Sequence, residues 1–335
     1  MRRTGFFAAT GFAALSIVLS ACNTESDPGT SAAGGSDALD LEAVRATFAT
    51  EFGATKPGES QPADLVDLGR ELYHAEQLSL KGNLSCASCH KLDAFGQDNE
   101  PTSPGSTGER GERNSPASVN AFRQLAQFWD GRAPDVETQA QGPILNPIEH
   151  GFAKPDEFLA ALKAIDGIEA KFQAAFPGDD DPVTVENFGR AVGAFERTLW
   201  TKSRFDALLD GDDNALTAEE KAGLKTFMEV GCITCHNGRT VGGGMYQKLG
   251  LVQPYETEDK GRGAHTGNAA EDYFFKVPML LNVAETAPYF HDGSVKTLEE
   301  AVRLMAKHQL GKQLTDEQVA SIVTFLKSLT GDPQW

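Results

Sequence analysis

The sequence predicts an all-α protein built from two helical domains. Apolar residues recur at the spacing of one helix face along several segments, and Thr-x-x-Glu/Gln capping boxes begin three of them. Alternation of apolar and polar residues, which is typical of strands, is scarce. A short cysteine motif, C-x-x-C-H, occurs twice and far apart, which suggests one copy per domain.

The helices follow in order along the chain. Their apolar faces are Leu65, Leu68, Gly69 and Leu72 before the first motif; Phe188, Val192, Phe195 and Leu199 between the motifs; Leu224, Phe227 and Met228 before the second; then Leu298, Ala301, Val302 and Met305, and Val319, Ile322, Val323 and Leu326. Thr184, Thr217, Thr297 and Thr315 stand at the starts of the last four. A turn near Gly211 separates the predicted domains, residues 39–200 and residues 201–331. An alternative for the last helix is that it packs back on the N-terminal domain.

Composition and charge disfavour some partners. The chain has 335 residues, with 48 acidic and 30 basic side chains and a formal net charge of −18. Nucleic acid is disfavoured because phosphate binding depends on clustered Lys and Arg, and the sequence shows no such cluster. A basic protein partner fits the charge better.

The N-terminus predicts export. Two arginines, an apolar run and the ending Leu-Ser-Ala-Cys indicate a signal peptide over residues 1–21. The ending resembles a bacterial lipobox, in which Cys22 is lipidated; an ordinary signal peptide with an incidental cysteine is the alternative. Residues 22–38, rich in Ser, Thr, Gly and Ala, are expected to form a flexible tether. Asn23 favours the outer membrane, and cleavage removes two arginines, so the mature charge is −20.

Four cysteines and two histidines form the two C-x-x-C-H motifs: Cys86, Cys89 and His90, then Cys232, Cys235 and His236. The spacing lets two thiols add to the vinyl groups of one haem while the adjacent imidazole reaches the iron. A zinc knuckle would need four ligands where each motif supplies three, and a redox disulfide would not need the histidine. The motifs therefore predict two covalently bound c-type haems, each in a cytochrome-c-like helical domain, with His90 and His236 as iron ligands.

Two haems on an exported chain fit either an electron carrier or an enzyme. A carrier keeps both irons six-coordinate, whereas an enzyme needs one open position. The ligands opposite the two motif histidines would decide, and residue types alone do not assign them. The candidates in the mature chain are Met228, Met245, Met279, Met305, His74, His150, His265, His291 and His308.

Longer motifs resemble those of the bacterial dihaem cytochrome c peroxidases, a family related to MauG. They are Q-F-W-D-G-R-A over 127–133, Q-A-Q-G-P over 139–143, N-P-I-E over 146–149 and T-A-P-Y-F-H-D-G over 286–293. The resemblance extends from about residue 60 to 331. It implies that the haem of the first motif is peroxidatic and that the haem of the second motif accepts electrons.

The resemblance also implies roles for single residues. Glu149 matches the distal carboxylate that moves a proton between the two oxygens of hydrogen peroxide. Gln139 matches a distal amide that holds peroxide or water, and Trp129 matches the tryptophan between the two haems. Met305 would be the distal ligand of the second haem, with Met279 as the fallback. The implied calcium ligands are oxygens of Asn114, Thr286 and Pro288.

The sequence departs from the family at one position. Family members often carry a distal histidine that closes the peroxidatic iron until the other haem is reduced, and Ser106 occupies that position here. A serine hydroxyl is a poor iron ligand, so the first haem is expected to be five-coordinate or water-bound and active without prior reduction. The alternative is that His150 replaces the missing ligand.

The resulting hypothesis is reduction of hydrogen peroxide to water with electrons from a small cytochrome c or a cupredoxin. The protein is expected in the periplasm, attached to the membrane only through a lipid anchor, and the family suggests a homodimer. An electron-transfer cytochrome and a MauG-like oxidase acting on a protein partner are the alternatives. Because the latter use another distal ligand at the second haem, Met305 favours the peroxidase.

Overall fold

The fold is known from a computed structural model that describes residues 39–335. The predicted signal peptide, lipid site Cys22 and tether lie outside the described residues. In the first half of the described chain, residues 39–200, the helices are α1 (Leu41–Thr47), α2 (Ala63–Tyr73), α3 (Cys86–Cys89), α4 (Val136–Ile144), α5 (Pro155–Lys163), α6 (Ile168–Ala175) and α7 (Val185–Glu196). In the second half, residues 201–335, they are α8 (Arg204–Leu209), α9 (Ala218–Val230), α10 (Arg262–Thr266), α11 (Leu298–Leu310) and α12 (Asp316–Lys327).

The helix-rich fold and its predicted helix starts are confirmed. Thr184 caps α7 by accepting a hydrogen bond from the backbone N–H of Asn187. Thr217 and Thr315 form full capping boxes at the starts of α9 and α12, and the Thr297 side chain caps α11. Each cap satisfies backbone N–H groups that the first helical turn leaves without a partner. Local sequence therefore sets where these helices begin.

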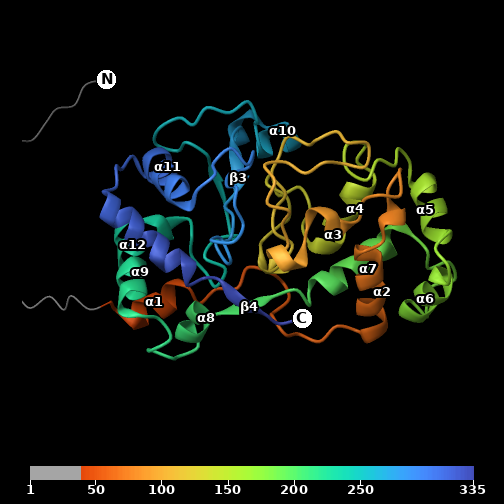
Figure 1. The fold of residues 1–335 in the computed structure, drawn as a ribbon, viewed down its shortest axis with the longest axis horizontal. Coiled ribbons are helices and arrows are strands. Elements are labelled where there is room, and N and C mark those ends of the chain that lie inside the picture. Colours follow the sequence, from red (N-terminus) through yellow and green to blue (C-terminus); the bar gives the residue numbers. More distant parts are fainter. Residues whose placement is uncertain (1–38) are drawn as a thin grey trace, which may run out of the picture. The chain divides into compact units, whose positions relative to one another are not determined.

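The first hydrophobic core forms around α2 and α7. These two helices pack against each other, and α4 packs against the other side of α7 (Figure 1). Leu68 and Leu72 of α2 meet Phe188 and Val192 of α7 in this core. The α5 and α6 helices add Phe158 and other buried side chains.

The second core forms around α9 and α12, which also lie against each other in Figure 1. Leu224 and Phe227 of α9 pack with Ile322 and Phe325 of α12 in this core. The last helix, α12, is therefore part of the second core. Phe48, which follows α1, also belongs to this second core, although it precedes the first motif in sequence.

Strands are few and short in the described part of the chain. β1 (Thr201–Ser203) pairs antiparallel with β4 (Gly331–Pro333), and β2 (Tyr246–Lys248) pairs antiparallel with β3 (Phe274–Lys276). The first pair ties the C-terminal residues to the segment that joins the two cores. Across residues 39–335, no helix has the length and apolar character needed to cross a bilayer.

Candidate active site and the two motif cavities

The first motif occupies α3 and faces a cavity of about 170 Å³. Cys86, Cys89 and His90 line it together with side chains from α4 and α7. His90 Nδ1 donates to the carbonyl oxygen of Gly96 at 3.2 Å, which leaves Nε2 as the nitrogen available to a metal. The Tyr73 hydroxyl donates to the His90 carbonyl oxygen at 2.7 Å and holds the main chain of the motif.

Two residues singled out in the sequence, Gln139 and Glu149, meet in this first cavity. Gln139 comes from α4 and Glu149 from the turn that follows α4. Asn146 Nδ2 donates to Glu149 Oε1 at 2.7 Å and orients the carboxylate. Burial raises the pKa of Glu149, while the hydrogen bond from Asn146 and the charge of Arg132 oppose this shift. The cavity thus contains a positioned carboxylate whose pKa lies above its usual value.

The serine at the position of the family's distal histidine points away from this chemistry. Ser106 Oγ donates to Asn83 Oδ1 at 2.8 Å and accepts from the backbone N–H of Lys81 at 3.0 Å. Its own backbone N–H donates to the Glu149 carbonyl oxygen at 2.8 Å. Gly105 lines the cavity, whereas Ser106 is not among its lining residues. Ser106 therefore supports the loop that carries Glu149 and offers no ligand.

His150 is the histidine candidate that reaches the first cavity. Its side chain is buried, and its Nδ1 donates to the Leu78 carbonyl oxygen at 2.5 Å. This bond fixes the ring against the main chain that precedes the motif. The role of His150 as a substitute ligand stays a prediction.

Trp129 lies between the two motifs, because it lines the first cavity and also the second. Its Nε1 donates to the Asn114 carbonyl oxygen at 2.9 Å, and its own carbonyl oxygen accepts from the backbone N–H of Lys276 at 2.8 Å. Trp129 is thus held from both halves of the described chain.

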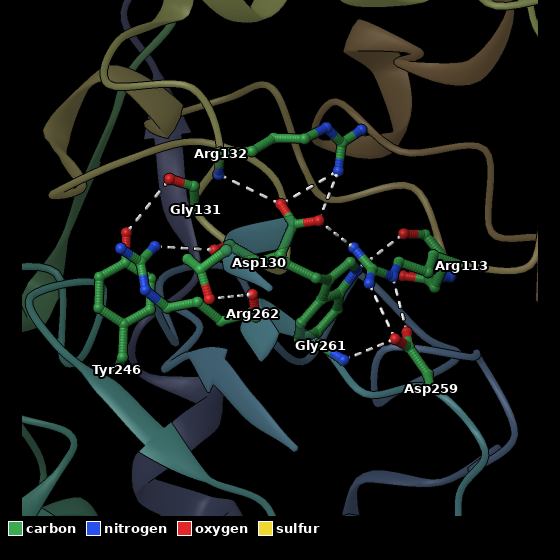
Figure 2. A network of polar contacts seen from close by, with 11 residues as sticks. Arg113, Asp130, Gly131, Arg132, Tyr246, Asp259, Gly261 and Arg262 are labelled. Carbon is green, nitrogen blue, oxygen red and sulfur yellow. Dashed lines mark hydrogen bonds and ion pairs between the residues drawn. The ribbon is translucent and has the colours of Figure 1, made fainter. Parts of the chain in front are cut away.

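A network of charges holds the turn that carries Trp129 (Figure 2). Arg113 donates to Asp130 at 2.7 Å and to both oxygens of Asp259, at 2.7 and 2.9 Å. Burial raises the pKa of Asp130, but the hydrogen bond from Arg113, the charges of Arg132 and Arg113 and a backbone hydrogen bond together outweigh burial, so the net pKa is lowered. Gly131 is required here, because its φ is +67° and a Cβ would overlap the Tyr246 hydroxyl. The network joins residues 113–132 to residues 246–262.

The second motif faces a larger and mainly apolar cavity of about 250 Å³. Cys232, Cys235 and His236 line it, and Met305 of α11 and Met279 line it as well. His236 Nδ1 donates to the Val241 carbonyl oxygen at 3.2 Å, so Nε2 is again the nitrogen available to a metal.

The thiols of the motifs are held in surroundings that suppress their ionisation. Burial raises the pKa of Cys86 and of Cys232 to about 12. Among residues 39–335, no group of three or more His, Cys, Asp or Glu side chains is arranged to hold a metal ion. The cavities beside the motifs, of which the second is mainly apolar, have the motif thiols in their walls and leave room for a bound group.

The predicted calcium positions also meet, along the wall of the second cavity. Asn114, Thr286 and Pro288 all line it. Asn114 Oδ1 accepts from Gln97 Nε2 at 3.0 Å, and Gln97 Oε1 is a buried oxygen without a hydrogen-bond partner. An unpaired buried oxygen beside these positions fits a site that takes a hard cation.

Two functional candidates were missed from the sequence. Glu196 of α7 is buried and lines the first cavity, and burial, with the nearby charge of Glu137, raises its pKa to about 8. Lys276 ends β3, is 5% exposed and lines the second cavity. A charged residue in a helix or strand is usually solvated, and no local pattern marks these two as buried.

Two helical cores, each presenting a C-x-x-C-H motif to a cavity and sharing one tryptophan between the cavities, define a protein of the dihaem c-type cytochrome class. A family model described as "Di-haem cytochrome c peroxidase" matches residues 63–214. The chain belongs to the di-haem cytochrome c peroxidase family, and it is an enzyme of that peroxidase class. The family implies two c-type haems.

Relatives and solved structures agree with this assignment. The chain is 44% identical to the cytochrome c551 peroxidase of Nitrosomonas europaea over 81% of both chains. It is 45% identical to that of Pseudomonas aeruginosa, over 79% of this chain and 78% of the relative. It is 30% identical to the methylamine utilization protein MauG of Methylorubrum extorquens, over 88% and 86%. The structure of a MauG-like protein associated with microbial copper homeostasis superposes with a TM-score of 0.72 at 27% identity, covering 84% of this chain and 93% of that one.

Proposed function

We propose that the protein reduces hydrogen peroxide to two waters, taking up two protons and two electrons from a small exported donor. The observation that carries the proposal is that Glu149, Gln139 and His90 line one cavity. We assign the first cavity the peroxidatic role and the second cavity the electron-accepting role. We place the boundary between the N-terminal peroxidatic domain and the C-terminal electron-transfer domain near residue 200.

Both cavities suit a covalently held haem. Each has the two thiols and the imidazole of one motif in its wall, with the imidazole already oriented by a backbone carbonyl. When bound, the haem groups supply redox-active iron that binds peroxide in the first cavity and accepts electrons in the second. Met305, which lines the same cavity as His236, would be a second ligand to the iron of this haem, and thioether ligation raises the reduction potential of such a haem.

The protein's own part in the chemistry is proton transfer. Glu149 accepts a proton from one oxygen of hydrogen peroxide and returns it to the departing oxygen. Asn146 holds the carboxylate in place for both steps. Gln139 donates a hydrogen bond that positions peroxide, and an amide does not itself transfer protons at neutral pH. Ser106 leaves the distal side open, so no prior reduction is needed.

Electrons enter at the second cavity and pass Trp129 on the way to the first. The acidic chain, with a formal net charge of −18, attracts a basic cytochrome c, and a cupredoxin is the other donor class. We place the protein in the periplasm, anchored through Cys22 to the outer membrane, and propose a homodimer. Calcium is proposed at Asn114, Thr286 and Pro288, where the unpaired Gln97 oxygen supports it.

The test is Glu149→Gln in the holoenzyme. We expect the rate of peroxide reduction to fall about 10²- to 10⁴-fold while both haem spectra persist, because the amide cannot shuttle a proton. The matched control is Glu169→Gln on the exposed side of α6, which should retain the wild-type rate. Unchanged turnover in Glu149→Gln would overturn the proton-transfer role of Glu149. Similarity to MauG supports a second candidate, oxidation of a protein partner, which predicts slow peroxide turnover even in the wild type.

A further inference from the structure

Lys276 is a buried cation without an anionic partner in the described structure. It is the one residue with a formally charged side chain among those that line the second cavity. Its Nζ donates to the amide oxygen of Gln124, and within residues 39–335 it forms no ion pair. The main chain around it is fixed, because its backbone N–H donates to Trp129 and β3 pairs with β2.

A buried ammonium with only an amide oxygen beside it is energetically unfavourable. Burial lowers the pKa of Lys276 to about 7. Buried charges in proteins are usually paired or bound to a ligand of opposite charge. The cations that line the first cavity are less buried than Lys276 and are nonetheless paired, since Arg113 and Arg132 both bond to Asp130. The second cavity alone has an unbalanced positive charge in its lining.

The chemistry of the expected occupant supplies the missing anion. A c-type haem keeps two propionate carboxylates after its vinyl groups have reacted with the thiols of the motif. Cys232, Cys235 and His236 lie in the wall of the same cavity as Lys276, so the haem that they hold shares this cavity. The residues that line the second cavity include no Asp or Glu, so the haem propionates are the anionic groups expected there.

We propose that Lys276 is the counter-ion of a haem propionate in the second cavity and that it raises the reduction potential of that haem. Reduction adds one electron to the haem, so a nearby positive charge in a low-dielectric cavity stabilises the reduced state. Together with thioether ligation, this favours electron acceptance from a donor. The inference rests on haem binding at the second motif and not on peroxide reduction.

The experiment compares Lys276→Met and Lys276→Arg holoproteins with the control Lys248→Met. Lys248 lies on the neighbouring strand β2 but is exposed, so its loss changes the net charge equally without touching the cavity. Spectroelectrochemical titration measures the potential of each haem. We expect Lys276→Met to lower the potential of the second haem and leave that of the first unchanged. Lys276→Arg and Lys248→Met should stay close to the wild type.

A second readout tests direct contact. Redox-induced infrared difference spectra report carboxylate stretches, and a band of the second haem should shift in Lys276→Met but not in Lys248→Met. If Lys276→Met does not mature with two haems, Lys276→Gln, which can still bond to Gln124, takes its place in both measurements. A wild-type potential for the second haem in the uncharged variant overturns the proposal. Loss of turnover with unchanged potentials would bear on the peroxidase function and would also overturn this role for Lys276.

Discussion

At the scale of single residues, the state of the first haem depends on whether a protein side chain is available as its second iron ligand. The Ser106 hydroxyl donates to Asn83 Oδ1 and accepts from the backbone N–H of Lys81, so it is not available as a ligand to the first haem. We predict that the ferric first haem of the isolated protein is five-coordinate or water-bound and that turnover begins without prior reduction. Electron paramagnetic resonance and a comparison of oxidised with half-reduced enzyme check this. A purely low-spin signal with two nitrogen ligands at the first haem would contradict it and would favour His150 as the ligand.

Asn146 is predicted to set the pH dependence through Glu149. The carboxylate must be deprotonated to accept a proton, so activity falls as pH drops through its pKa. Burial already raises that pKa and the Asn146 hydrogen bond lowers it, so Asn146→Ala should raise the pKa further. We expect the acidic limb of the kcat/KM profile to move to higher pH, with a smaller loss of rate than in Glu149→Gln. An acidic limb at the wild-type position would show that Glu149 is not the titrating base.

At the scale of elements, each core contains a close helix crossing at a glycine. Gly69 of α2 meets the main chain of Ala191 in α7, and Gly223 of α9 meets that of Ser321 in α12. In both cases an added Cβ would overlap a backbone carbonyl oxygen. A helix interior otherwise prefers Ala to Gly, so close packing decides these positions against helix propensity.

We therefore predict that Gly223→Ala destabilises the protein by about 1–3 kcal/mol, because α9 and α12 must separate to admit the methyl group. Denaturant unfolding of the holoprotein measures this. Glu219→Ala on the exposed face of α9 serves as the control and should change the free energy of unfolding by less than about 0.5 kcal/mol. A more stable Gly223→Ala variant would show that helix propensity outweighs the crossing.

At the scale of the whole molecule, the net negative charge is expected to raise the rate of association with a basic electron donor. With a basic cytochrome c, we predict that kcat/KM falls by roughly tenfold or more as ionic strength rises from about 0.01 M to about 1 M, because the Debye length shrinks from about 30 Å to about 3 Å. Steady-state assays with a small neutral reductant provide the control, which should be nearly independent of salt. Equal salt dependence with both donors would rule out electrostatic steering.

The sequence by itself determined the helical class, the helix starts and the two motifs, because these follow from contacts over a few residues. A capping threonine bonds to a backbone N–H three positions on, and two thiols of C-x-x-C-H are close in any short turn. Through the family resemblance, the longer motifs also identified Glu149, Gln139 and Trp129 as candidate functional residues.

Only the tertiary structure decided which of these side chains share a cavity and which charges are buried. Trp129 lines both cavities because the Arg113 network and the β3 main chain hold its turn, and these contacts span more than a hundred positions. Lys276 and Glu196 look like ordinary surface charges in the sequence, yet packing encloses both. Burial is a property of the whole fold, and it is burial that converts a common charged residue into a candidate functional group.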